Sequence, residues 1–94
     1  MTRNKREPIA YTNENVVHTI KIIEALEGAN FEPVSIQTIM DRTDLKRDKC
    51  MRVLMTLKVL GWVAQDSKNN WLVGSKILRF SNRYSEFLVA NSMK

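Results

Sequence analysis

Residues 44–62, DLKRDKCMRVLMTLKVLGW, are basic at one end and apolar at the other. The first nine residues hold four cationic side chains, and those that follow are almost all apolar. On a helix from Lys46 to Gly61, one face is apolar and the opposite face begins with cations. The apolar face comprises Cys50, Val53, Leu54, Leu57 and Leu60, and the outer face comprises Asp48, Met51, Arg52, Met55 and Val59. The pattern predicts a helix held by a small core, with its first turns open to a polyanion.

The charges of the whole chain support this interpretation. The net charge is +3 over residues 1–6, −5 over 7–45 and +7 over 46–94. Lys46, Arg47 and Lys49 stand at a helix start, where a cation opposes the macrodipole at a cost of about 0.3–1 kcal/mol each. Folding alone would not select them there, whereas a phosphate-bearing ligand would offset that cost. Ordinary solubilising charge is the alternative.

Two helices are expected before this segment. The first starts at Asn13 or Asn15 and stops near Gly28, with Val16, Ile20, Ile23 and Leu26 in one stripe. Val17 and Ile22 lie on the flanks of that stripe, which indicates either a wide buried face or a dimer contact. The second helix covers residues 36–43 behind a Ser35 cap, after a short extended piece at Val34.

After Trp62 the hydrophobic period changes to two. WVAQD and WLVG are typical of strands, and SKNN between them can form the turn of a hairpin. Ser75 can cap a last helix over about 75–90. This order predicts a mainly α protein with a small β-hairpin: a winged helix-turn-helix with an additional C-terminal helix, over residues 13–94. Residues 1–12 are expected to be a basic, flexible arm that enters a minor groove or stays solvated.

Several classes of function are disfavoured by what the sequence lacks. A chain of 94 residues holds one domain, and its one cysteine, Cys50, leaves no internal disulfide or zinc cluster. No glycine-rich phosphate loop, metal-ligand cluster or nucleophile with a nearby histidine is evident, so we expect no enzyme, cofactor or metal. No signal peptide or apolar run of about 18 residues is present, which favours a cytoplasmic protein without membrane contact.

Residues 16 to about 80 resemble the N-terminal DNA-binding domain of the isocitrate-lyase-regulator (IclR) family of bacterial transcription factors. The segment TIKIIEAL is similar to the family pattern alrILEAL. Residues 34–74, VSIQTIMDRTDLKRDKCMRVLMTLKVLGWVAQDSKNNWLVG, are similar to lslaelaratGLpkstvhRlLatLvalGyveqd…yrlG. The most telling matches are Arg52, Leu54, Leu57, Leu60, Gly61, Val63, Asp66 and Gly74.

The resemblance implies a winged helix that binds duplex DNA, usually as a homodimer, with the helix from Lys46 in the major groove. The positions that would face bases or phosphates are Lys46, Arg47, Asp48, Lys49, Met51 and Arg52, with Ser35 and Gln37 near the backbone and Lys68 at the wing tip. Lys46, Asp48, Lys49 and Met51 depart from the family pattern, so a target sequence cannot be transferred. The family's large effector domain lies beyond the resemblance, and no small-molecule effector is expected.

Alternatives remain at three points. Arg52 can contact DNA or merely pair with Asp48, four residues earlier. Met55 and Val59 are expected to be covered by the hairpin or the N-terminal segment, or else to form a partner surface. The whole domain can be a regulator, including one of the phage or plasmid type, or a winged-helix adaptor that binds other proteins or serves replication or recombination.

Overall fold

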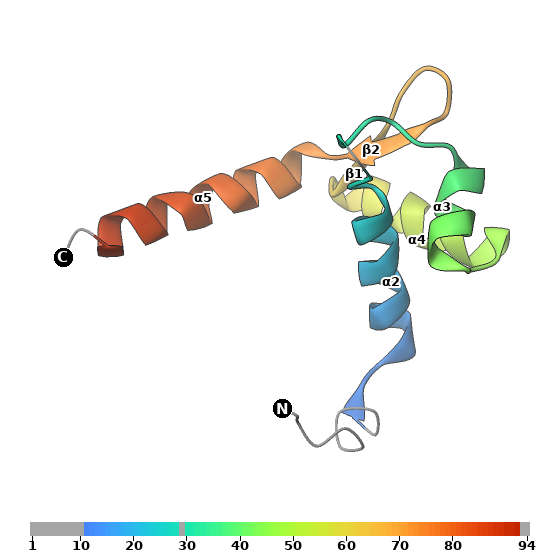
Figure 1. Ribbon diagram of the computed structural model, residues 1–94, viewed down its shortest axis with the longest axis horizontal. Coiled ribbons are helices and arrows are strands. Elements are labelled where there is room, and N and C mark those ends of the chain that lie inside the picture. The colour runs from blue at the N-terminus through green and yellow to red at the C-terminus, as the bar shows by residue number, and fades with distance from the viewer. Residues whose placement is uncertain (1–10, 29, 93–94) are drawn as a thin grey trace.

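The computed structural model describes residues 11–28 and 30–92, so most of the expected N-terminal arm, with Arg3, Lys5 and Arg6, lies outside the described residues. In chain order its elements are α2 (Glu14–Ala25), α3 (Ile36–Thr43), α4 (Arg47–Leu60), β1 (Val63–Gln65), β2 (Trp71–Val73) and α5 (Ser75–Ser92) (Figure 1). The expected fold class, a mainly helical winged helix with one hairpin and a C-terminal helix, is confirmed.

Local chemistry fixes the helix ends. The Asn13 side chain accepts hydrogen bonds from the backbone N–H groups of Asn15 and Val16 and so caps α2. Ser35 caps α3 in the same way, accepting from Thr38 N at 3.1 Å. Gly61 ends α4 with φ 87°, a left-handed conformation that glycine adopts without steric cost.

The core lies where α2, α3, α4 and the base of the hairpin meet. Its largest fully buried side chains are Trp71, Ile22, Leu26, Ile39, Leu54 and Cys50. β1 and β2 pair antiparallel, with Ala64 opposite Leu72, and Trp71 also exchanges backbone hydrogen bonds with Val34 at 2.9 and 2.7 Å. Trp71 therefore attaches the hairpin to the strand-like segment before α3, as expected for a tryptophan at the wing base.

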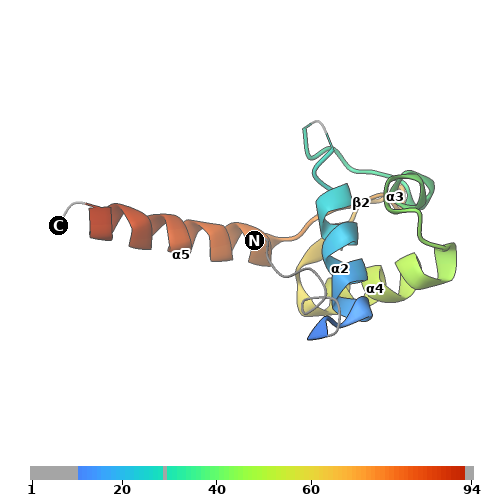
Figure 2. The same ribbon diagram turned by 60° about the horizontal axis from the view of Figure 1, so that its bottom comes forward.

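The buried face of α2 differs from the expected stripe. Ile22, Ala25 and Leu26 are buried, whereas Val16 and Ile20 are 57% and 48% exposed. The reason is that α2 packs on α3 as well as on α4, so its buried arc is centred between these two helices and not on the most hydrophobic line. Figure 2 shows α2 crossing over α4 with α3 to one side.

The C-terminal half of α4 also departs from expectation. Leu60 is 50% exposed although its helical position predicts a core residue. Met55 and Val59 are 45% and 82% exposed, so the hairpin does not cover them, and the alternative expectation of a partner surface stays a prediction. Most of the N-terminal segment that was expected to cover them lies outside the described residues. The hairpin packs on the head through its base, where Val63 and Trp71 are buried, and leaves residues 58–60 at the end of α4 exposed.

α5 leaves the rest of the molecule. In both views it extends away from the other helices, and none of its residues is buried (Figures 1 and 2). Its contact with the hairpin base includes an edge-to-face pair between Trp62 and Phe80, with ring centroids 5.8 Å apart. The described residues thus form a packed head, 11–28 and 30–74, and one projecting helix, α5.

Candidate nucleic-acid interface

A tight turn presents the start of α4. The Thr43 hydroxyl donates to the Ile39 carbonyl at 2.8 Å and accepts from the backbone N–H of Leu45 at 3.3 Å. Asp44 adopts a left-handed conformation, with φ 60°, and its N–H donates to the Met40 carbonyl at 2.8 Å. These bonds satisfy the end of α3. The three-residue turn 44–46 then leads into α4 at Arg47, which is the geometry of a helix-turn-helix.

The first turn of α4 carries cations and lacks a capping side chain. Lys46 occupies the N-cap position with extended backbone and makes no side-chain cap hydrogen bond. The first N–H groups of a helix have no intrahelical partner, and together with the dipole they favour an anion. Lys46, Arg47 and Asp48 are all exposed. This end of the helix therefore offers both backbone donors and exposed positive charge.

Arg52 stands one turn further along the same outer face. Its Nη2 lies 3.1 Å from Asp48 Oδ2, and the two side chains are 78% and 79% exposed. An exposed pair of this spacing contributes roughly 0.3–0.5 kcal/mol, too little to hold the guanidinium against a better ligand. The ion pair that the sequence suggested is present, and it leaves Arg52 open to solvent.

Lys49 is placed differently from the other cations. Its Nζ donates to Asn15 Oδ1 at the start of α2, and the residue is half-buried. This contact directs Lys49 towards the α2 side of α4. Asn15 was not expected at the site, because nothing in a single sequence indicates that residues 34 positions apart touch.

Met51 is less exposed than its position on the outer face predicts. It is half-buried and packs against the core cluster. α3 lies along that side of α4, so the covered arc of α4 is wider than the apolar stripe alone. Part of the Met51 side chain therefore packs against the core and is not open to a ligand.

The α3 candidates have local partners. The Ser35 hydroxyl is half-buried and caps α3, within 3.1 Å of the Thr38 hydroxyl. Gln37 is exposed and its Nε2 donates to Asp41 Oδ1 at 2.9 Å. Ser35 thus has a structural task whatever else it contacts, while Gln37 can exchange a weak surface bond for another partner.

The wing tip is ordered by one carboxylate. Asp66 Oδ1 accepts from the backbone N–H groups of Lys68 and Asn70, both at 2.9 Å, and Asn69 takes the left-handed conformation with φ 66°. The hydrogen bond from Asn70 is the main reason that the pKa of Asp66 lies below its ordinary value. Lys68 is exposed at this tip, and both the tip and the start of α4 lie on the side of the head away from α5 (Figure 1).

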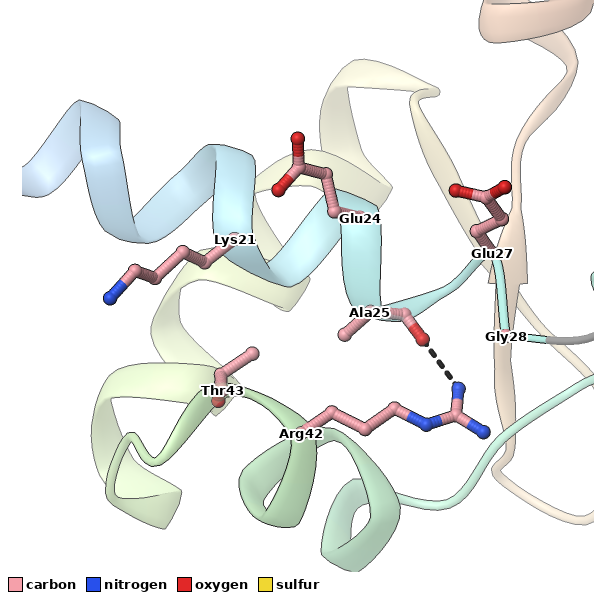
Figure 3. Close-up of a pocket in the computed structure, with 7 residues that line it drawn as sticks. All are labelled: Lys21, Glu24, Ala25, Glu27, Gly28, Arg42 and Thr43. Carbon is pink, nitrogen blue, oxygen red and sulfur yellow. Dashed lines mark hydrogen bonds between the residues drawn. The ribbon is translucent and has the colours of Figure 1, made fainter.

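The concavity shown in Figure 3 lies elsewhere, between the end of α2 and the end of α3, with a volume of about 550 Å³. Its lining mixes Lys21 and Arg42 with Glu24 and Glu27. Arg42 points into it but donates from Nη1 to the Ala25 carbonyl at 2.6 Å, which completes the C-terminal end of α2. We assign this arginine to folding, since its guanidinium already has a backbone acceptor.

Two kinds of feature do not occur in the part of the chain that the structure describes. Over 11–28 and 30–92, no helix is both long and apolar enough to span a bilayer. In the same residues no three histidine, cysteine or acidic side chains come together where they could hold a metal ion.

Comparison with known proteins identifies the fold. No family model and no curated protein matches the sequence. Among solved structures, an IclR transcriptional regulator from Alicyclobacillus acidocaldarius matches 82% of this chain and 31% of its own, with a TM-score of 0.75 and 19% identity. An IclR family transcriptional regulator from Brucella abortus matches 82% and 30%, with a TM-score of 0.71 and 19% identity. HmgR of Pseudomonas aeruginosa matches 76% and 29%, with a TM-score of 0.66 and 25% identity.

This chain spans about three tenths of the length of the regulators that it matches. The matched part covers most of the head and part of α5, since it includes up to 82% of the chain. The resemblance inferred from the sequence is therefore confirmed at the level of structure: the chain has the winged helix-turn-helix fold found in IclR-family transcriptional regulators.

Proposed function

We propose that this chain binds duplex DNA sequence-specifically, as a homodimer, and regulates transcription in the cytoplasm of a prokaryotic or phage-infected cell. The observation that carries the proposal is the start of α4, which is cationic, exposed and uncapped, while the other side of the helix is buried through Cys50, Leu54 and Leu57. A rigidly held helix whose first turns are free is what the major groove accepts. The likeness to transcriptional regulators supports this use of the fold.

Two kinds of contact are assigned within the site. Arg52, supported by Asp48 at 3.1 Å, would contact a guanine edge, because an arginine can donate two parallel hydrogen bonds there. Arg47, Lys46 and Lys49 would contact phosphates. At the edge of the interface we assign a contact with the major groove to Met51 and contacts with the DNA backbone to Gln37 and Ser35. Lys68 would contact the DNA backbone from the wing tip.

The test begins with duplexes selected from a random pool by the purified protein. Affinity should fall with salt by a slope of about −0.9 per neutralised phosphate. Arg52→Ala should cost about 1–3 kcal/mol on the selected sequence and reduce discrimination between bases. Arg47→Ala should weaken all sequences alike and flatten the salt slope by about one unit.

Arg79→Ala in α5 is the matched control, since it removes one exposed positive charge outside the proposed interface. It should leave base discrimination unchanged. If Arg52→Ala and Arg79→Ala behave alike, direct reading by Arg52 is excluded. If no duplex is selected, the DNA proposal itself fails.

A protein adaptor is the second candidate, and a specific observation favours it. α2 and α5 expose large apolar side chains, among them Val16, Ile20, Tyr84 and Phe87. Surfaces of this kind mark protein contacts. The salt dependence separates the two functions, because an adaptor that binds through these apolar faces would keep its affinity as ionic strength rises.

A further inference from the structure

α5 carries a regular apolar seam. It runs through Ile77, Phe80, Tyr84 and Phe87, and the polar Asn91 continues the same alternating spacing of three and four. This is the pattern of a and d positions in a heptad, with a at Ile77, Tyr84 and Asn91 and d at Phe80 and Phe87. A seam of this period suits a second helix running alongside.

The seam is uncovered from Phe80 onward in the described structure, while Ile77, next to the head, is half-buried. Phe80, Tyr84 and Phe87 are 68%, 59% and 58% exposed, and Leu88 beside them is 46% exposed. Tyr84 and Phe87 lie nearly parallel, with centroids 6.4 Å apart, so they form one continuous aromatic strip. Large aromatic side chains left in water along one face of an 18-residue helix imply an occupant.

The flanking charges favour a second copy of α5 in parallel. Lys76 and Arg83 occupy g positions, while Ser81 and Leu88 occupy e positions. In a parallel pair each g residue faces an e residue, so no cation meets a cation across the seam. An antiparallel pair would bring the g positions together and place Arg83 near its own counterpart. Asn91 at an a position is also the kind of residue that specifies a parallel dimer.

The available area is sufficient for specific pairing. Aromatic side chains bury about 150–250 Å² each when fully covered. With the exposures above, the seam and its flanks offer on the order of 500 Å² per copy, which reaches the roughly 1,000 Å² in total that a specific interface needs. The seam is also fixed to the head, because Phe80 packs on Trp62 at the hairpin base.

We propose that α5 pairs with α5 of a second copy as a short parallel coiled coil, with both heads at its N-terminal end. The pairing itself is independent of any ligand; its use in DNA binding rests on the proposed function. A two-fold axis along the coil would present two α4 helices to one duplex, so the selected sites should be inverted repeats.

The first test measures self-association by analytical ultracentrifugation without DNA. Wild-type protein should form a dimer as its concentration rises. Phe87→Glu should weaken the affinity of dimerisation by at least about tenfold, because both copies then place a charge in the seam. Val89→Glu is the matched control: Val89 is 57% exposed, against 58% for Phe87, and lies on the other side of α5. It should dimerise as wild type does.

Two results would overturn the pairing: a wild-type monomer at hundreds of micromolar, or equal dimerisation of wild type and Phe87→Glu. Equal dimerisation would indicate that the two copies pair through the exposed face of α2 and not through α5. A monomer that instead binds an acidic amphipathic peptide through the seam would assign it to a different protein.

The second test concerns direction. In a parallel pair Asn91→Cys places two thiols together at one a layer, so mild oxidation should give a covalent dimer, while Val89→Cys should not. The native Cys50 is buried and should not interfere. Cross-linking only between Ile77→Cys and Phe87→Cys chains, an a and a d position, would show an antiparallel pair and contradict the proposal.

The two proposals can fail separately. Phe87→Glu keeps the whole α4 surface, so it should still bind a single half-site duplex with the salt dependence of the wild-type head. Loss of the dimer with retained half-site binding supports both proposals. A dimer that binds no DNA would remove the proposed function and leave the α5 pair intact.

Discussion

α4 and α5 are both amphipathic helices, of 14 and 18 residues, but only α4 has its apolar face buried in the core. In α4 the side chains of Cys50, Leu54 and Leu57 are buried, whereas α5 has no buried residue. The difference lies in their neighbours: α2 and α3 pack across α4, and α5 touches the head mainly through β1. Amphipathic spacing therefore predicts that a helix face will be covered, but which element covers it depends on the tertiary structure.

The largest expected effect separates the two helices directly. Leu54→Ala should lower the free energy of unfolding by about 2–5 kcal/mol, because Leu54 is 0% exposed and its removal leaves a cavity. Leu88→Ala in α5 should change it by less than about 0.5 kcal/mol when measured in urea at concentrations low enough to keep the protein monomeric. Equal losses would contradict the division into a packed head and a free helix.

The junction between the two regions gives the next effect. A Cβ on Gly74 would lie 2.5 Å from the Gly61 carbonyl oxygen and 2.8 Å from the Trp62 carbonyl carbon, both backbone atoms. Gly74→Ala should therefore cost about 1–3 kcal/mol of stability, since the backbone must shift. Thermal unfolding would show it. Ser75, expected from the sequence to cap α5, is instead its first helical residue and is exposed. Ser75→Ala therefore serves as the control and should be nearly silent.

A smaller effect is expected inside the head, at the end of α2. Arg42→Ala removes the 2.6 Å hydrogen bond to the Ala25 carbonyl and should cost about 1 kcal/mol. Arg79→Ala, an exposed arginine of α5, should change stability by less than about 0.5 kcal/mol. If both substitutions lower the free energy of unfolding equally, the hydrogen bond from Arg42 does not stabilise the end of α2.

The sequence predicted most of the head, because its signals are local. Ser35 as a cap, the hairpin around SKNN and the apolar line of Cys50, Leu54 and Leu57 each depend on residues close in the chain. The order of elements then leaves few ways to assemble them. The cationic start of α4 was predicted for the same reason, since the four cations lie within seven consecutive residues.

What the sequence did not predict depends on distant contacts. The contact between Lys49 and Asn15 and the half-burial of Met51 follow from how α2 and α3 lie against α4. The exposure of Val16, Ile20 and Leu60 has the same origin. Periodicity identifies a hydrophobic face, but the angle at which helices cross decides which part of that face is covered.

The smallest expected effect is a pH dependence confined to the wing tip. Because the pKa of Asp66 is lowered from 3.8, chiefly by the hydrogen bond from the Asn70 backbone, the folded turn favours the carboxylate. Its stabilisation is present above the ordinary value and is lost as the pH falls through the lowered one. The backbone amide signals of Lys68 and Asn70 should therefore shift together in NMR, with a midpoint below 3.8. Asp66→Asn should abolish this shared transition and leave the signals of α5 unchanged, whereas a midpoint at or above the ordinary value would mean that the carboxylate does not order the turn.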